Sequence, residues 1–118
     1  MATVNYEIVK NDVRCKIIKW EGLTETNADG QPYVFSGRYP DKSVQIFGTF
    51  GSGGTCKLQG TNEVNSPTNW WGLSDHGGTE IAAQAAAIEV VLENVYQVRP
   101  YISAGTGVDI DVYLCIKG

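Results

Sequence analysis

Residues 108–117 read VDIDVYLCIK, and this run carries the clearest structural signal in the chain. Apolar side chains recur at every second position, which is the period of a β-strand with one buried face. The first face holds Val108, Ile110, Val112, Leu114 and Ile116. The second face holds Asp109, Asp111, Tyr113, Cys115 and Lys117. We expect the first face to be buried and the second to meet water or a partner.

Shorter runs with the same character precede this strand. Each is rich in β-branched or aromatic residues and is bounded by turn formers, as strands are. They are VRCKIIKW (13–20), SVQIFGTF (43–50), GTCKLQG (54–60) and VYQVRPYIS (95–103). The glycine-bearing segments 50–55 and 104–107 predict two hairpins, each joining the strands on either side of it.

Two segments are less regular. The run IAAQAAAIEVVLENV (81–95) fits both periods, because alanine favours a helix and its β-branched residues favour a strand. We expect a helical turn or loop over 81–86, followed by a strand over 87–93. Residues 21–41 carry Asp29-Gly30 and two prolines, so they predict an irregular surface excursion with a short strand over 33–36.

The sequence therefore predicts one all-β domain over residues 1–118. Its fourteen glycines are many for this length and suit a chain with many tight turns. We expect an antiparallel β-sandwich of about seven to eight strands, with at most a short helical turn and with a jelly roll as one arrangement it could take.

Composition excludes several classes of function. A formal net charge of −4 argues against nucleic-acid binding, which needs clustered lysine and arginine. No apolar run is long enough to span a membrane, and the first residues do not form a secretory signal. Three cysteines without CxxC spacing suit small buried residues in a reducing cytosol, so we expect no metal site and no cofactor.

The residues that could carry catalysis are few, and the sequence predicts that the chain is not an enzyme. The single histidine, His76, lies in the turn-forming string SDHGG, where no nucleophile is placed beside it. Asp109 and Asp111 share a strand face and could hold calcium or act as an acid–base pair. We favour an exposed polar face for this pair, because charged side chains there discourage edge-to-edge pairing.

The adjacent tryptophans of LQGTNEVNSPTNWWGLSDHGG (58–78) are the most unusual local feature. Neighbouring side chains in extended backbone point to opposite faces, so we expect one of Trp70 and Trp71 in the core and the other outside. An outward tryptophan could stack on a sugar, anchor a protein contact or cap its own loop. As the contact surface we predict Tyr33, Phe35 and Tyr39 of the excursion, together with the outward tryptophan.

The same region carries a family resemblance. LQGTN followed by NWWGLSD and GG resembles the pattern LxGSNDGxxWxxLxDxxG of small virion proteins of tailed double-stranded DNA bacteriophages. The ending VLENVYQVRPYISAGTGVDIDVYL is also similar to theirs, so the resemblance covers about residues 44–114. The chain departs from the pattern at Thr61 and Glu63, where serine and aspartate are usual, and lacks the glycine that follows them there. Trp71 is an additional aromatic residue.

The resemblance implies a structural role. It predicts a capsid decoration (cement) protein that is made in the bacterial cytoplasm, binds the major capsid protein on the outer surface of the assembled head, and associates with copies of itself. Two alternatives stay open: a tail or neck component of the virion, and a discoidin-like carbohydrate-binding β-sandwich, since discoidin-like modules carry similar turn-tryptophan strings.

Overall fold

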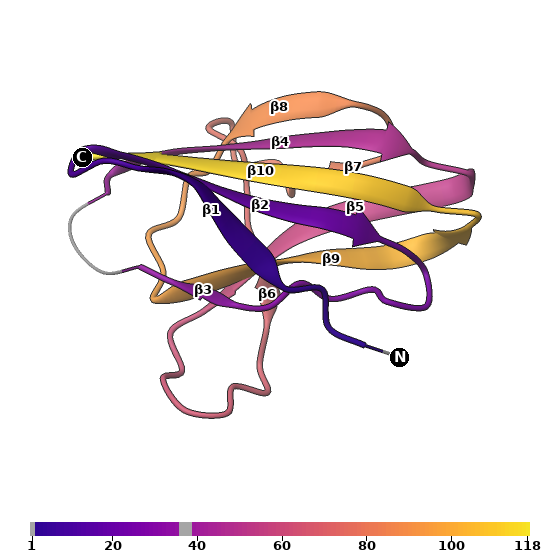
Figure 1. Cartoon of the computed structure of the whole chain (residues 1–118), viewed down its shortest axis with the longest axis horizontal. Helices are drawn as coiled ribbons and strands as arrows, with labels where there is room; N and C mark the ends of the chain where they lie inside the picture. The colour runs from indigo at the N-terminus through magenta and orange to yellow at the C-terminus, as the bar shows by residue number, and fades with distance from the viewer. Residues whose placement is uncertain (1, 36–38) are drawn as a thin grey trace.

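A computed structural model describes residues 2–35 and 39–118 of the chain (Figure 1). These residues form ten strands and no helix, arranged in two antiparallel five-stranded sheets. The first sheet contains, in spatial order, β1 (Tyr6–Asn11), β2 (Cys15–Leu23), β10 (Asp109–Lys117), β4 (Asp41–Thr49) and β8 (Ala87–Val90). The second contains β3 (Tyr33–Val34), β9 (Gln97–Thr106), β5 (Ser52–Thr61) and β6 (Trp71–Gly72), with β7 (Ala82–Ala83) also on β5. The predicted all-β sandwich is confirmed.

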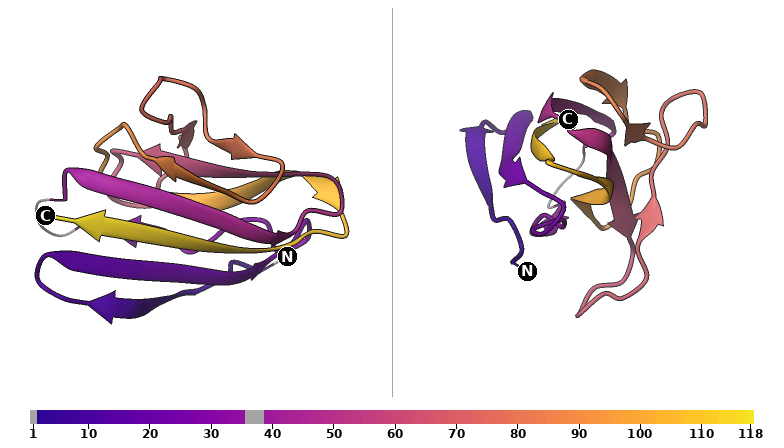
Figure 2. Two further views of the ribbon diagram at one scale, coloured as in Figure 1. Left: turned by 90° about the horizontal axis from the view of Figure 1, so that it is seen from above. Right: turned by 90° about the vertical axis from the view of Figure 1, so that its right-hand side faces the viewer.

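The strand order is that of a jelly roll. Strands from the first half of the chain pair with strands from the second half in reverse order: β2 with β10, β3 with β9, β4 with β8, and β5 with β6. Successive pairs lie alternately in the first and the second sheet. The paired halves of the chain thus form a long antiparallel ribbon that rolls up into the jelly-roll sandwich. Figure 2 shows β4, β10 and the β1–β2 hairpin side by side in the first layer.

The two predicted glycine hairpins are wrong, because both connections cross between the sheets. β4 and β10 pair in the first sheet, ending at Thr49↔Asp109, while β5 and β9 pair in the second, from Ser52↔Thr106 onward. The ribbon therefore turns a corner between these two pairs. Gly105 has a φ of +121°, and a Cβ on it would lie 2.5 Å from the Cα of Gly54. Glycine lets β5 and β9 approach each other closely beside the corner.

The core lies between the sheets. Ile110, Val112, Leu114 and Ile116 of β10 are all fully buried, which confirms the inward face read from the alternation. Trp20 of β2 is the largest fully buried side chain. Its indole Nε1 donates a hydrogen bond of 2.9 Å to the carbonyl oxygen of Gln31, so this buried polar atom is satisfied.

The irregular segments fold partly as expected. The helical turn or loop predicted over 81–86 is confirmed only for the bend at residues 84–86, because Ala82–Ala83 form the short strand β7. The strand predicted over 87–93 is present as Ala87–Val90. Within the excursion, β3 covers Tyr33–Val34, and Ser36 lies outside the described residues. β1 was not predicted: it is an edge strand that is mostly exposed, so its sequence lacks a clear buried face.

Candidate functional site

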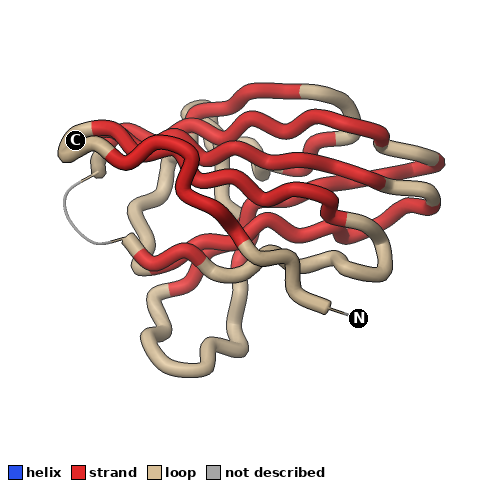
Figure 3. Tube along the Cα trace, viewed as in Figure 1, coloured by secondary structure: helices blue, strands red, loops and turns tan. Residues whose placement is uncertain are grey.

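The loop of residues 62–70, between β5 and β6, extends away from both sheets (Figure 3). Side chains and backbone groups fix its shape. The Glu63 carboxylate accepts hydrogen bonds from the amides of Thr68 (3.1 Å) and Asn69 (2.8 Å), and these bonds lower the pKa of Glu63. The Asn62 side chain accepts from the amide of Tyr96 at 3.0 Å, which ties the base of the loop to the segment before β9.

The same turn shows what Thr61 and Glu63 contribute locally. Thr61 Oγ1 accepts a hydrogen bond of 3.1 Å from the amide of Glu63, as a serine hydroxyl could. Glu63 has a carboxylate, as aspartate does, and its longer side chain reaches amides five and six positions further along the chain. Both residues therefore support the turn rather than disturb it.

Neither Trp70 nor Trp71 belongs to the hydrophobic core, so the prediction that one of them does is wrong. Trp71 is 74% exposed at the start of the two-residue edge strand β6. Trp70 is partly buried, but its ring lies under the guanidinium of Arg99 instead of between the sheets. The core tryptophan is Trp20. The two neighbours do lie in different surroundings, one held against the sheet and one facing solvent.

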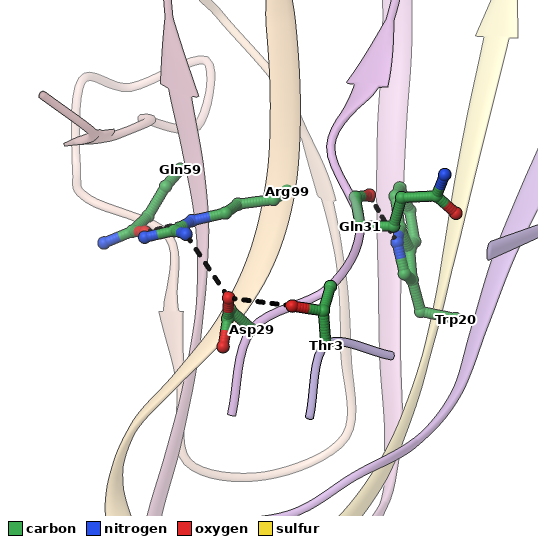
Figure 4. Close-up of polar contacts among 6 residues, drawn as sticks. All are labelled: Thr3, Trp20, Asp29, Gln31, Gln59 and Arg99. Atoms are coloured by element: carbon green, nitrogen blue, oxygen red, sulfur yellow. Dashed lines mark hydrogen bonds and ion pairs between the residues drawn. The ribbon is translucent and has the colours of Figure 1, made fainter. Parts of the chain in front are cut away.

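Arg99 organises a polar cluster on the second sheet (Figure 4). Its Cζ lies 4.4 Å from the ring centroid of Trp70 and 5.4 Å from that of Tyr101, within the range of cation–π contacts. Its Nε donates to Gln59 Oε1 at 3.0 Å, and one terminal nitrogen lies 3.6 Å from Asp29 Oδ2. Burial lowers the pKa of the guanidinium, and the Asp29 carboxylate opposes that shift. The cluster therefore places Trp70 in contact with Arg99 of β9.

The aromatic excursion packs inward, which corrects part of the predicted contact surface. Tyr33 is only 5% exposed, and its ring meets those of Tyr6 and Phe35 edge-on at centroid distances of 5.4 and 5.7 Å. A side chain so covered cannot present a contact surface, so Tyr33 is wrong as a contact residue. Phe35 and Tyr39 are partly buried against the core. Of the five predicted contact residues, Trp71 is the one with a largely exposed side chain.

The residues considered for catalysis or metal binding, His76, Asp109 and Asp111, lie in a turn or on the outer face of a strand. His76 lies in a turn in which Asp75 Oδ1 accepts from the amides of Gly77 (2.9 Å) and Thr79 (3.1 Å), as expected for a turn residue. Asp111 accepts a hydrogen bond of 3.0 Å from the amide of Gly22, where the pairing of β2 and β10 is irregular. Its neighbour on the same face, Asp109, is exposed.

Within residues 2–35 and 39–118, no group of three or more His, Cys, Asp or Glu side chains is placed to hold a metal ion. The same residues also contain no helix of the length and apolar character needed to cross a membrane.

The structure reveals a second surface that the sequence analysis did not identify. Apolar side chains gather on the outer face of the first sheet and line an open groove of about 270 Å³. This outer patch consists of Val9, Ile17, Ile88, Val90, Tyr113 and Cys115. The signal was present, because Tyr113 and Cys115 interrupt the polar face of the last strand, and Ile88 and Val90 alternate in the same way.

Comparison with known proteins identifies no relative: no family model, no curated protein and no solved structure matches this chain.

Proposed function

We propose that this chain is a non-enzymatic virion structural protein of a tailed bacteriophage, of the capsid decoration type, and that it binds the major capsid protein through the loop 62–70 and Trp71. The observation that carries the proposal is the exposure of Trp71, at 74%, beside a loop whose shape is fixed by its own hydrogen bonds. The phage family is suggested by the sequence resemblance.

A fixed loop favours binding because little conformational entropy is lost when a partner covers it. Tryptophan is enriched among the residues that dominate binding energy in protein interfaces. Val64 adds a second exposed apolar side chain to the loop, at 59%. A protein that binds the assembled shell, and not its free subunits, stabilises the shell by mass action and needs no reaction.

The jelly-roll order is compatible with this role but does not decide it. Jelly rolls occur in viral capsid proteins and also in lectins, and a fold alone does not specify a function. A tail or neck placement would use the same kind of contact with a different virion protein. The number of copies per particle separates these placements.

The test is cosedimentation of the purified chain with phage heads that lack it. The expected result is saturable binding that weakens at least about 30-fold in Trp71→Ala, as for an interface residue worth about 2 kcal/mol. Val13→Ala is the matched control, because Val13 is 90% exposed in the turn between β1 and β2. No cosedimentation, or equal binding of Trp71→Ala and the wild type, would contradict the proposal.

A carbohydrate-binding module is the second candidate, and the same exposed indole favours it. Trp71 lies next to Trp70, which forms part of the Arg99 and Gln59 polar cluster, and sugar sites combine an aromatic ring with polar groups. Soluble glycans would then quench tryptophan fluorescence in the wild type and not in Trp71→Ala. That outcome, without binding to phage heads, would favour the carbohydrate module.

A further inference from the structure

The outer patch is unusual for the outer face of a sandwich sheet. Antiparallel sheets normally bury one face and present polar side chains to water on the other. Here Val9, Ile88 and Val90 are 54%, 66% and 50% exposed. Contiguous exposed apolar surface of this kind marks an interaction site.

Strand register places the side chains of the patch in rows across the sheet. Cys115 of β10 is opposite Ile17 of β2 on one side and Ser43 of β4 on the other, and Ser43 is opposite Val90 of β8. In the next row, Tyr113 is opposite Gln45, which is opposite Ile88. The apolar side chains of the two rows form a band across the strands, interrupted on β4 by Ser43 and Gln45. Val9 of β1 lines the same groove, whereas the second row continues from Tyr113 to Lys19 of β2.

Charged side chains lie at the two ends of the sheet, on either side of this band, and the net charges of the two ends differ in sign. The end where β10 begins carries three carboxylates, those of Glu21, Asp109 and Asp111. At the other end, among residues 2–35 and 39–118, three cations exceed two carboxylates: Lys10, Arg14 and Lys117 against Asp12 and Asp41. Two of these charges neutralise each other locally, since Lys10 and Asp12 form an ion pair of 2.8 Å. Lys19 lies 3.4 Å from Glu21 and reduces the negative charge of the first end.

We propose that the outer patch binds a second copy of this chain, face to face, about a two-fold axis that runs across the strands. Such an axis reverses the strand direction, so the acidic end of one copy lies over the basic end of the other. The apolar bands meet between these ends, as self-complementary surfaces do in isologous dimers. The loop 62–70 belongs to the second sheet and remains free, so this proposal does not depend on binding to a shell.

The size of the face is sufficient for a specific dimer. Five strands about 4.8 Å apart, with nine residues of about 3.3 Å each in β10, give a face of about 24 by 30 Å. Allowing for the shorter β1 and β8, about 600 Å² per copy is covered, or about 1,200 Å² in total. This value lies at the lower limit of specific interfaces, so we expect a dimer that dissociates on dilution.

Sedimentation velocity over about 1 to 200 µM protein tests the proposal. The wild type is expected to change from monomer to dimer, and Ile88→Glu to weaken dimerisation at least tenfold, because it places a charge in the apolar band. Val64→Glu is the matched control: it adds the same charge at a site of similar exposure, 59% against 66%, in the loop on the other sheet. A wild type that stays monomeric, or a dimer unaffected by Ile88→Glu, would overturn the proposal.

Charge reversal tests the orientation. Lys117→Glu and Asp109→Lys should each weaken the dimer, and the double variant should restore it, because each new charge then faces its opposite in the partner copy. Failure of the double variant to restore dimerisation would exclude the proposed axis. Loss of shell binding in Val64→Glu with an intact dimer would separate the two surfaces. Circular dichroism spectra matching the wild type would show that each variant is folded.

Discussion

Replacing each tryptophan by alanine should cause three different losses of stability. The chain has three tryptophans, and their surroundings cover the whole range from core to solvent. Trp20 is fully buried, Trp70 is partly buried under Arg99, and Trp71 is 74% exposed. The free energy of unfolding should therefore fall most for Trp20→Ala and least for Trp71→Ala.

The magnitudes follow from burial and hydrogen bonding. Trp20→Ala leaves a large cavity between the sheets and should cost about 3–5 kcal/mol. It also leaves the Gln31 carbonyl without its indole donor, which places the loss near the upper end of that range. Trp70→Ala removes a cation–π contact and partial burial and should cost about 1–2 kcal/mol. Trp71→Ala should change stability by less than about 0.5 kcal/mol.

Urea unfolding followed by far-ultraviolet circular dichroism is the suitable assay, because fluorescence changes when a tryptophan is removed. Domains of this kind are stable by about 5–15 kcal/mol, so Trp20→Ala could unfold the chain. Trp20→Phe is the second variant: it keeps an aromatic ring, loses the N–H donor, and should cost about 1–3 kcal/mol. A Trp71→Ala loss above 2 kcal/mol, or no loss for either Trp20 variant, would refute this reasoning.

Three further results are expected. Burial raises the pKa of the Cys56 thiol from about 9 to about 12, so this thiol ionises at a lower pH in the unfolded chain than in the folded chain. Above pH 9 the free energy of unfolding should therefore fall by about 1.4 kcal/mol per pH unit, and less steeply in Cys56→Ala. Urea midpoints measured at pH 8 and pH 10 would reveal this difference. Arg99→Lys keeps the charge but removes the guanidinium that contacts the Trp70 ring and donates to Gln59. It should lower the free energy of unfolding by about 1–2 kcal/mol, and an unchanged urea midpoint would show that these contacts contribute nothing. Because its pKa is lowered, the Glu63 carboxylate stabilises its loop above the ordinary carboxyl pKa and loses this effect as the pH falls. At pH 7, Glu63→Ala should therefore speed hydrogen exchange at the amides of Thr68 and Asn69. Equal exchange rates in the variant and the wild type would contradict the role of this carboxylate.

Local periodicity predicted the strands better than their pairing. Alternation over 108–117 identified β10 and its buried face, because a strand between two neighbours with one covered side imposes a period of two. The same glycine-rich segments suit a hairpin and a corner between sheets, so the local sequence could not separate the two. Pairing of Thr49 with Asp109, sixty residues away in the chain, is what identifies the corner.

The candidate site was predicted in part. The sequence predicted that one of Trp70 and Trp71 lies in the core and the other outside, without choosing between them. The rule of opposite faces does not place a neighbour in the core when the strand has two residues and lies at a sheet edge. Tyr33 was predicted as a contact because it lies in an irregular segment, yet the excursion folds back on the core and covers it. The outer patch required the register of four strands, which no single segment contains.

The most direct test of the proposed virion role is the number of copies of this chain in purified particles of the phage to which it is proposed to belong, measured by quantitative mass spectrometry against the major capsid protein. A number comparable to that of the capsid protein is the result that the decoration proposal predicts. A few copies per particle would contradict decoration and indicate the tail or neck, and complete absence would contradict a virion role altogether.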